Sequence, residues 1–165
     1  MNKKSLYLSF AILTVFVVVI FSLFFYVKNY RRNNDKKFKL ESKYYNDNGL
    51  TDVSVKELEE IVKNKESFIL FVYNDFCSFS VPCDTVFDKA SKNMNLQILQ
   101  ISYRDYKKAN IKKKIKYAPS VLIYIDGKVD KYLDTEKDED KKRYQDEYAF
   151  RSWVSKNIYV EKKKN

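Results

Sequence analysis

Residues 5–27 form an uncharged, apolar segment that is suited to lipid, whereas the rest of the chain is suited to water. At about 1.5 Å per residue, a helix of this length crosses the hydrocarbon core of a bilayer, which is roughly 30 Å thick. We therefore expect a short tail at 1–4, a transmembrane helix at 5–27, a polar tether at 28–50 and one domain at 51–165.

A cleaved signal peptide is the alternative interpretation of this segment. The basic start of the chain, MNKK, fits a signal peptide. However, the apolar run is longer than the 7–15 residues of a typical signal-peptide core, and no A-x-A-like cleavage site follows it. We interpret the segment as an uncleaved anchor.

The basic residues around the apolar segment give conflicting evidence on its orientation. Lys3 and Lys4 precede the segment, while more bases follow it, and the positive-inside rule would leave the domain in the cytoplasm. Lysine is abundant throughout the chain, however, and a short basic start resembles signal-anchors that export a domain. Because disulfides persist outside the cytosol, a pair of cysteines also favours export. We expect a single-pass protein of the cell membrane with an extracytoplasmic domain, against the charge evidence.

The composition excludes several kinds of chemistry. Histidine is absent, which removes Ser-His and Cys-His catalytic pairs and the commonest ligand of transition metals. Two cysteines cannot build a closed four-ligand Cys/His zinc site, so we expect no metal and no cofactor. The net charge of +10 is not gathered on the domain, where 23 basic and 19 acidic residues are interleaved, and we expect no nucleic-acid binding.

Local patterns predict a mixed sheet of four strands with helices on both faces. Ser54 and Glu57 form a capping-box pattern, Phe68–Tyr73 is a continuous run of strand formers, and Asp126-Gly127 is a hairpin turn signal. The expected elements are helices through 55–62, 83–94 and 105–116, strands at 68–73, 96–101, 120–125 and 128–133, and a last helix through 150–158. We expect 134–147 to be a solvated loop or the start of an exposed helix.

Three local features resemble the thioredoxin superfamily. The segment FILFVYNDFC, residues 68–77, is a strand that runs into a cysteine, as the family's first core strand does. Pro82 and Cys83 open the next helix like the Pro-Cys that closes the family's C-x-P-C motif. The segment KYAPSVLIYIDGKVDKYL, residues 116–133, is similar to the family's cis-proline, strand, turn and return strand, with Pro119 as the cis-proline.

The resemblance covers roughly residues 54–158, and the motif departs from the family pattern in two respects. Five residues separate Cys77 from Cys83, where the family usually has two. Aligned from the strand, Cys77 takes the nucleophile position; aligned from the helix, Ser80 replaces the nucleophile. The buried acid that the family often keeps in this strand would fall at Phe71.

The resemblance implies roles for four residues. Cys77 would attack a disulfide and Cys83 would resolve the mixed disulfide, while Ala118 and Pro119 would present backbone groups to an extended substrate. A disulfide between Cys77 and Cys83 requires Cα atoms about 4.4–6.8 Å apart, so the intervening residues must turn back. A structural disulfide between the same cysteines, or two inert thiols, are the alternatives.

We therefore expect a three-layer α/β, thioredoxin-like domain preceded by a transmembrane helix. Its function would be thiol-disulfide exchange on cysteine-containing proteins or with a redox partner. The alternative is a redox-inactive binding or accessory module with a structural disulfide, for example in secretion, bacteriocin export or surface assembly.

Overall fold

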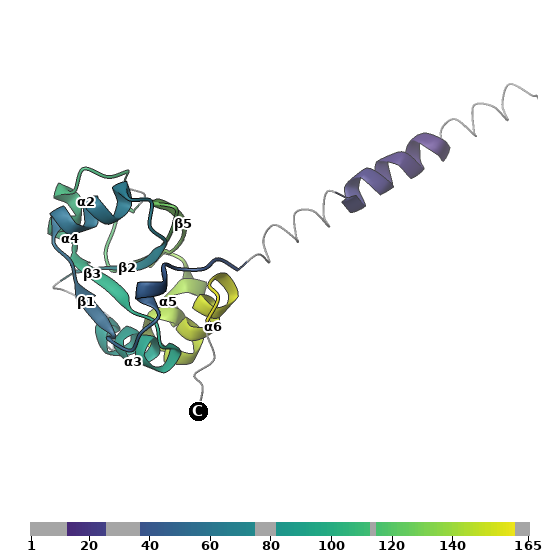
Figure 1. Ribbon diagram of the computed structural model, residues 1–165. Coiled ribbons are helices and arrows are strands. Elements are labelled where there is room, and N and C mark those ends of the chain that lie inside the picture. Colours follow the sequence, from purple (N-terminus) through teal and green to yellow (C-terminus); the bar gives the residue numbers. More distant parts are fainter. Residues whose placement is uncertain (1–12, 26–36, 75–81, 113–114, 161–165) are drawn as a thin grey trace, which may run out of the picture. The chain divides into compact units, whose positions relative to one another are not determined.

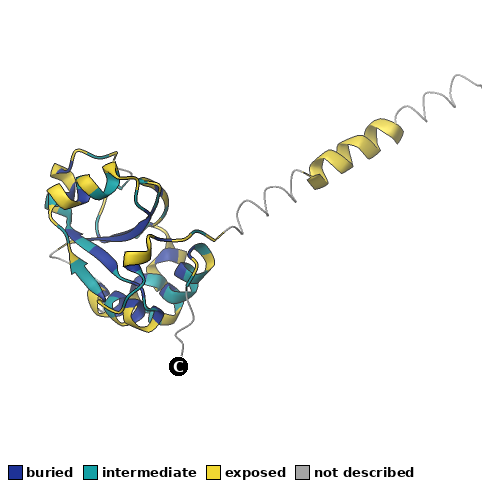
Figure 2. Ribbon diagram, in the orientation of Figure 1, coloured by how far each residue is buried: buried dark blue, intermediate teal, exposed yellow. Residues whose placement is uncertain are grey.

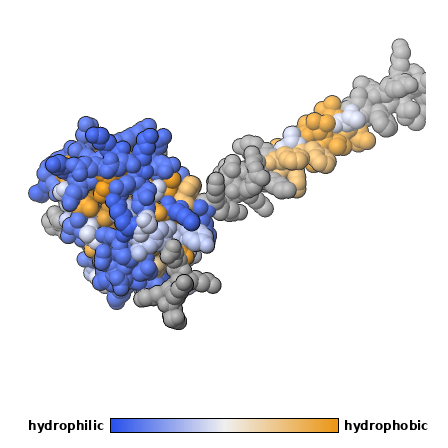
Figure 3. All heavy atoms as spheres, in the orientation of Figure 1, coloured by the Kyte–Doolittle hydropathy of each residue, from blue (hydrophilic) through white to orange (hydrophobic). Residues whose placement is uncertain are grey.

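A computed structural model describes residues 13–25, 37–74, 82–112 and 115–160. The chain divides into two compact units, Met1–Lys36 and Lys37–Asn165. Residues 13–25 of the first unit are helical, and their large apolar side chains are 49–66% exposed (Figure 3). No helix among the described residues is both long and apolar enough to cross a membrane. The span that we expect at 5–27 extends beyond the described helix at both ends.

The second unit is built on one mixed sheet, in which the described residues supply five strands. These are β1 (Leu50–Asp52), β2 (Phe68–Tyr73), β3 (Ile98–Ser102), β4 (Ser120–Ile125) and β5 (Lys128–Leu133). Their order is β1-β3-β2-β4-β5; the first three are parallel, and β4 and β5 add an antiparallel hairpin. The expected four-stranded sheet is thus extended by β1 at its edge.

Helices cover both faces of this sheet (Figure 1). α2 (Val55–Lys63) and α4 (Tyr103–Lys108) pack together on one face. α3 (Cys83–Met94), α5 (Asp138–Gln145) and α6 (Glu147–Asn157) pack together on the other. A 3-10 turn, η1 (Ser42–Tyr44), precedes β1. This three-layer order, with a hairpin beside parallel strands, is the thioredoxin-like arrangement expected from the sequence.

The hydrophobic core lies between the sheet and these helices (Figure 2). All residues of β2 from Phe68 to Val72 are buried, in agreement with a strand covered on both faces. On the α3 face, the ring of Phe87 contacts Phe71 at 4.9 Å and Phe150 at 4.4 Å between centroids. These aromatic contacts fix α3 and α6 against the centre of the sheet.

Several local predictions are confirmed. Ser54 caps α2 with a capping box, its hydroxyl accepting from the backbone N–H of Glu57 and Glu57 accepting from the Ser54 N–H. Asp126 and Gly127 have φ values of 51° and 71°, as a tight hairpin turn requires. The Ala118–Pro119 peptide bond is cis.

Residues 37–50, which we assigned to the tether, belong to the folded unit. Leu40 and Tyr44 are buried, and Phe38 pairs with the end of the domain through bonds to Asn157 and from Tyr159. Strand β1 then pairs with β3. The partners in these contacts lie far away in the sequence. The segment itself therefore has no regular spacing of apolar residues from which a fold could be predicted.

Two helices also differ from expectation. The helix predicted over 105–116 is the short α4, because Ala109 takes an extended conformation that ends it. The segment 134–147 contains α5, in which Tyr144 and Asp140 are buried. This segment is therefore not a solvated loop, because Tyr144 bonds to Leu133 at the end of β5 and Asp140 bonds to Asp134.

Candidate functional site

One end of the sheet collects the segments that carry the predicted site. Strands β2 and β3 finish there, β4 begins there because it runs antiparallel to β2, and β5 returns to it. In the register of the sheet, Val72 near the end of β2 lies opposite Ser120 at the start of β4. The chain then passes from β2 through residues 75–81, which the structure does not describe, into α3.

Cys83 is the first residue of α3 and is only 2% exposed. It belongs to the face of α3 that packs on the sheet, together with Val86 and Phe87. Pro82 precedes it as an exposed N-cap residue with extended backbone angles, φ −58° and ψ 122°. The fixed φ of proline suits the entry to a helix, so this dipeptide places the sulfur inward at the end of the sheet.

The cis Ala118–Pro119 bond lies beside the same end of β2. Pro119 is buried and Ala118 is half-buried, directly before β4. Two hydrogen bonds hold the preceding residues: the Ser120 hydroxyl donates to the Tyr117 carbonyl at 2.8 Å, and the Tyr103 hydroxyl donates to the Lys116 carbonyl. The second bond ties this segment to the start of α4.

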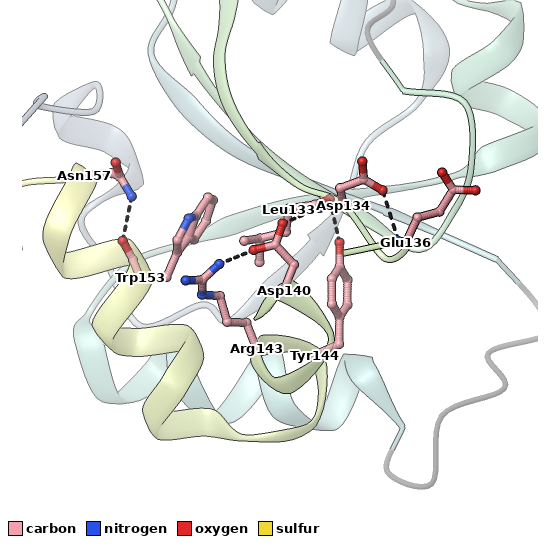
Figure 4. A network of polar contacts seen from close by, with 8 residues as sticks. All are labelled: Leu133, Asp134, Glu136, Asp140, Arg143, Tyr144, Trp153 and Asn157. Carbon is pink, nitrogen blue, oxygen red and sulfur yellow. Dashed lines mark hydrogen bonds and ion pairs between the residues drawn. The ribbon is translucent and has the colours of Figure 1, made fainter. Parts of the chain in front are cut away.

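A buried tyrosine of α5 connects Cys83 with the strand that follows the cis-proline. The Tyr144 side chain is fully buried, and its ring meets the ring of Phe87, one turn after Cys83, at 5.6 Å. Its hydroxyl donates to the carbonyl of Leu133 at 2.9 Å (Figure 4). Leu133 lies opposite Val121, two residues after Pro119.

The surroundings of the Tyr144 hydroxyl keep it protonated. Burial raises the pKa of Tyr144 far above its usual value, and negative charge on Asp140, Cys83 or Asp134 raises this pKa further. A hydrogen bond with the backbone of Val121 acts in the opposite direction. Tyr144 therefore stays a neutral hydroxyl, within electrostatic reach of Cys83 and bonded to Leu133 at the end of β5.

A buried carboxylate supports α5 below this tyrosine (Figure 4). Asp140 accepts from the backbone N–H of Asp134 at 2.9 Å and pairs with Arg143. Its side chain is 7% exposed, against 27% for Arg143. The hydrogen bond from Asp134 to Asp140 joins the segment after β5 to α5, and this helps to fix the position of Tyr144.

The surface at this end of the sheet is hollowed on both sides of the strand ends. A cavity of about 400 Å³ lies at the ends of β2 and β3, lined by Tyr73, Asn74, Ser102, Tyr103, Arg104, Asp105, Lys107 and Lys108. A smaller cavity of about 170 Å³ lies at the start of β4 and the end of β5, lined by Ile115, Lys116, Tyr117, Ser120, Tyr132, Asp134 and Glu136. Neither wall contains a group of three or more potential metal ligands, and the described residues hold no such group elsewhere.

Of the predicted site residues, the structure brings Cys83, Ala118 and Pro119 to this one end. Cys77 lies outside the described residues, so its pairing with Cys83 stays a prediction. Phe71 is buried against Phe87, so no acid takes the position that the family often gives to one. Tyr144 was missed, because one tyrosine in a run of charged residues gives no apolar period.

No protein-family model matches the chain, and no curated protein sequence is similar to it. Solved structures of thioredoxins do resemble it. Oxidised thioredoxin from Plasmodium falciparum is 19% identical, with a TM-score of 0.46 over 61% of this chain and 98% of that one. Thioredoxin from Trypanosoma brucei brucei is 14% identical, with a TM-score of 0.41 over 72% and 99%. A chain from the crystal structure of a ferredoxin:thioredoxin reductase and thioredoxin f2 complex is 20% identical, with a TM-score of 0.43 over 65% of this chain and 96% of that one.

Proposed function

We propose that this chain is a membrane-tethered, thioredoxin-like protein that exchanges disulfides with cysteine-containing proteins through Cys77 and Cys83. The observation that carries the proposal is the meeting of Cys83, the cis Ala118–Pro119 bond and Tyr144 at one end of the sheet. Cys83 begins α3 after the end of β2, and Pro119 directly precedes β4, whose first residue pairs with Val72 near that end.

The proposed reaction uses the two sulfurs in turn. The Cys77 thiolate attacks one sulfur of a substrate disulfide, forming a mixed disulfide and releasing the other substrate sulfur as a thiolate. The Cys83 thiolate then attacks the Cys77 sulfur, forms the Cys77–Cys83 disulfide and releases the second substrate thiolate. The substrate gains two electrons, and the protons lost by the two cysteines end on its thiols. A partner dithiol returns the pair to the reduced state by the reverse steps.

The burial of Cys83 fits the resolving role. A sulfur with 2% exposure is shielded from large partners and reacts most readily with a sulfur held within its own chain. Ala118, half-buried before β4, and the buried Pro119 would present backbone groups to the extended substrate while Cys77 is engaged.

The proposed tether is the apolar segment at 5–27, with the domain outside the cytoplasm. The described part of this segment is helical and exposes large apolar side chains over its length, which water does not favour. Protease treatment of intact cells tests the orientation. Digestion of the domain without lysis supports export, whereas digestion only after lysis would place it inside.

A redox titration of the full chain in detergent tests the exchange function. Reversible reduction of one dithiol pair in glutathione buffers supports it, and a pair that never oxidises or resists reduction contradicts it. In an insulin-reduction assay, Cys77→Ser should abolish turnover. Cys83→Ser should instead accumulate a mixed disulfide, visible as a mass increase that dithiothreitol reverses. Ser78→Ala is the matched control and should keep activity.

A redox-inactive binding or accessory module is the second candidate. The observation that favours it is Phe71, which puts an aromatic ring where the family often has a buried acid. The five-residue spacing between the cysteines favours it as well. Absence of insulin reduction by the wild type and by both cysteine variants would support a binding role and refute exchange.

A further inference from the structure

The cavity of about 400 Å³ at the ends of β2 and β3 has a cationic wall. Arg104, Lys107 and Lys108 line it from α4, and all three are exposed. Asp105 is the one carboxylate among the described residues of this lining. Its hydrogen bonds with Lys108 and Ser102 lower the pKa of Asp105, and the positive charge of Arg104 adds to this effect.

Two of these cations have no acidic partner in the described part of the chain. Lys108 pairs with Asp105 at 2.7 Å, which neutralises that pair. The ammonium of Lys107 instead lies 4.7 Å from the centre of the Tyr103 ring, and Arg104 forms no ion pair with a described residue. The cavity therefore holds two positive charges, beside an aromatic ring, that an external anion can satisfy.

This cavity adjoins the proposed exchange site. Tyr73 and Asn74 in its wall are the last described residues before the segment that carries Cys77. On its other side, Tyr103 bonds to the carbonyl of Lys116, three residues before Pro119. A polypeptide held across the cis-proline would therefore continue into this cavity.

The opposite cavity carries the opposite charge. Asp134 and Glu136 line it at the end of β5, and Lys116 is the one cation among its described lining residues. Acidic side chains of a ligand would be repelled there and attracted at α4. The end of the sheet thus has a cationic cavity on one side and an acidic cavity on the other. This difference in charge would orient a bound segment that carries acidic residues on one side.

We propose that the cavity formed by Tyr103, Arg104 and Lys107 binds acidic residues that flank, on one side, the reactive cysteine of a partner protein. The inference rests on the proposed function for its cysteine, but the recognition itself is electrostatic. Exposed charge pairs contribute modestly to affinity and are screened by salt. At low ionic strength we expect a partner segment with such acidic residues to bind about three- to tenfold more tightly than one without them. This difference in affinity should shrink at high salt.

Binding is measured first without any redox chemistry. The probe is a rhodamine-labelled, cysteine-free peptide with three Asp residues, compared with the same peptide carrying Ser, in fluorescence anisotropy on the full chain in detergent. The double variant Arg104→Gln with Lys107→Gln should bind the acidic peptide about three- to tenfold more weakly than the wild type does. Lys63→Gln with Lys128→Gln removes equal charge at the hairpin end of the sheet, where α2 approaches Gly127, and should leave the affinity unchanged.

Exchange kinetics then separate this inference from the proposed function. Disulfide peptides with Asp residues before or after the cysteine should differ in kcat/KM, with only one arrangement preferred over the Ser peptide. Equal binding of Asp and Ser peptides, or equal losses in both double variants, would overturn the acidic site while leaving exchange intact. Binding of the Asp peptide through Arg104 and Lys107 without turnover of any disulfide peptide would uphold the site and refute exchange.

Discussion

Replacing Asp140 by alanine should destabilise the domain, because this buried carboxylate has two partners and little access to water. It accepts the backbone N–H of Asp134 at 2.9 Å and pairs with Arg143, while its own side chain is 7% exposed. Loss of a hydrogen bond to a charged acceptor costs about 1.5–3 kcal/mol. Arg143 is 27% exposed and can turn to solvent, so its lost partner adds at most about 1 kcal/mol. We expect a loss of about 2–3 kcal/mol.

Urea unfolding of the full chain in detergent, followed by tryptophan fluorescence, measures this loss. For a urea dependence of about 1–3 kcal/mol per molar, the midpoint should fall by about 1–2 M. Asp140→Asn keeps an oxygen that can accept from the Asp134 N–H, so its midpoint should fall by less than half as much. Equal midpoints for Asp140→Ala and the wild type would refute the argument that this carboxylate fixes α5 to the end of β5.

Two further predictions concern the rest of the domain. Burial raises the pKa of Glu66, but hydrogen bonds from Lys43 and Tyr44 outweigh it and lower this pKa overall. The stability that they provide is complete above the ordinary Glu pKa of about 4.3 and is lost as the pH falls through the folded value. Urea midpoints from pH 7 to 3 should therefore fall less steeply in Tyr44→Phe than in the wild type, and parallel curves would contradict this. Gly127→Ala should cost about 2–4 kcal/mol in urea unfolding, since φ is 71° and the new Cβ would lie 2.4 Å from the Val62 carbonyl; a cost under about 0.5 kcal/mol would contradict it.

The sequence predicted the elements whose signals are local. Ser54 and Glu57 cap their own helix, and Asp126 and Gly127 turn their own hairpin. The continuous apolar run of β2 follows from burial on both faces of the sheet. In each case, the residues that carry the signal also make the contacts, so no distant partner is needed to recognise them.

The features that were missed depend on partners far along the chain. Strand β1 has three residues and is defined by its pairing with β3. Tyr44 is buried before it, and its hydroxyl donates to Glu66 at 2.6 Å. Helix α5 is highly polar, and its burial depends on single residues such as Tyr144, which reaches Leu133. Single buried residues leave no period in a sequence.

Phe71 stands where the resemblance to thioredoxins would place a buried acid, and this affects how the proposed exchange handles protons. The ring of Phe71 packs on Phe87, so β2 offers no base to Cys83 from this position. Among the described residues, the Tyr144 hydroxyl of α5 lies within electrostatic reach of Cys83. Because burial raises the pKa of Tyr144, this hydroxyl holds its own proton and cannot serve as the base. Without a base from either position, the proton of Cys83 would pass to water or to the departing substrate thiolate, and substrates whose leaving thiol has a low pKa would be released fastest.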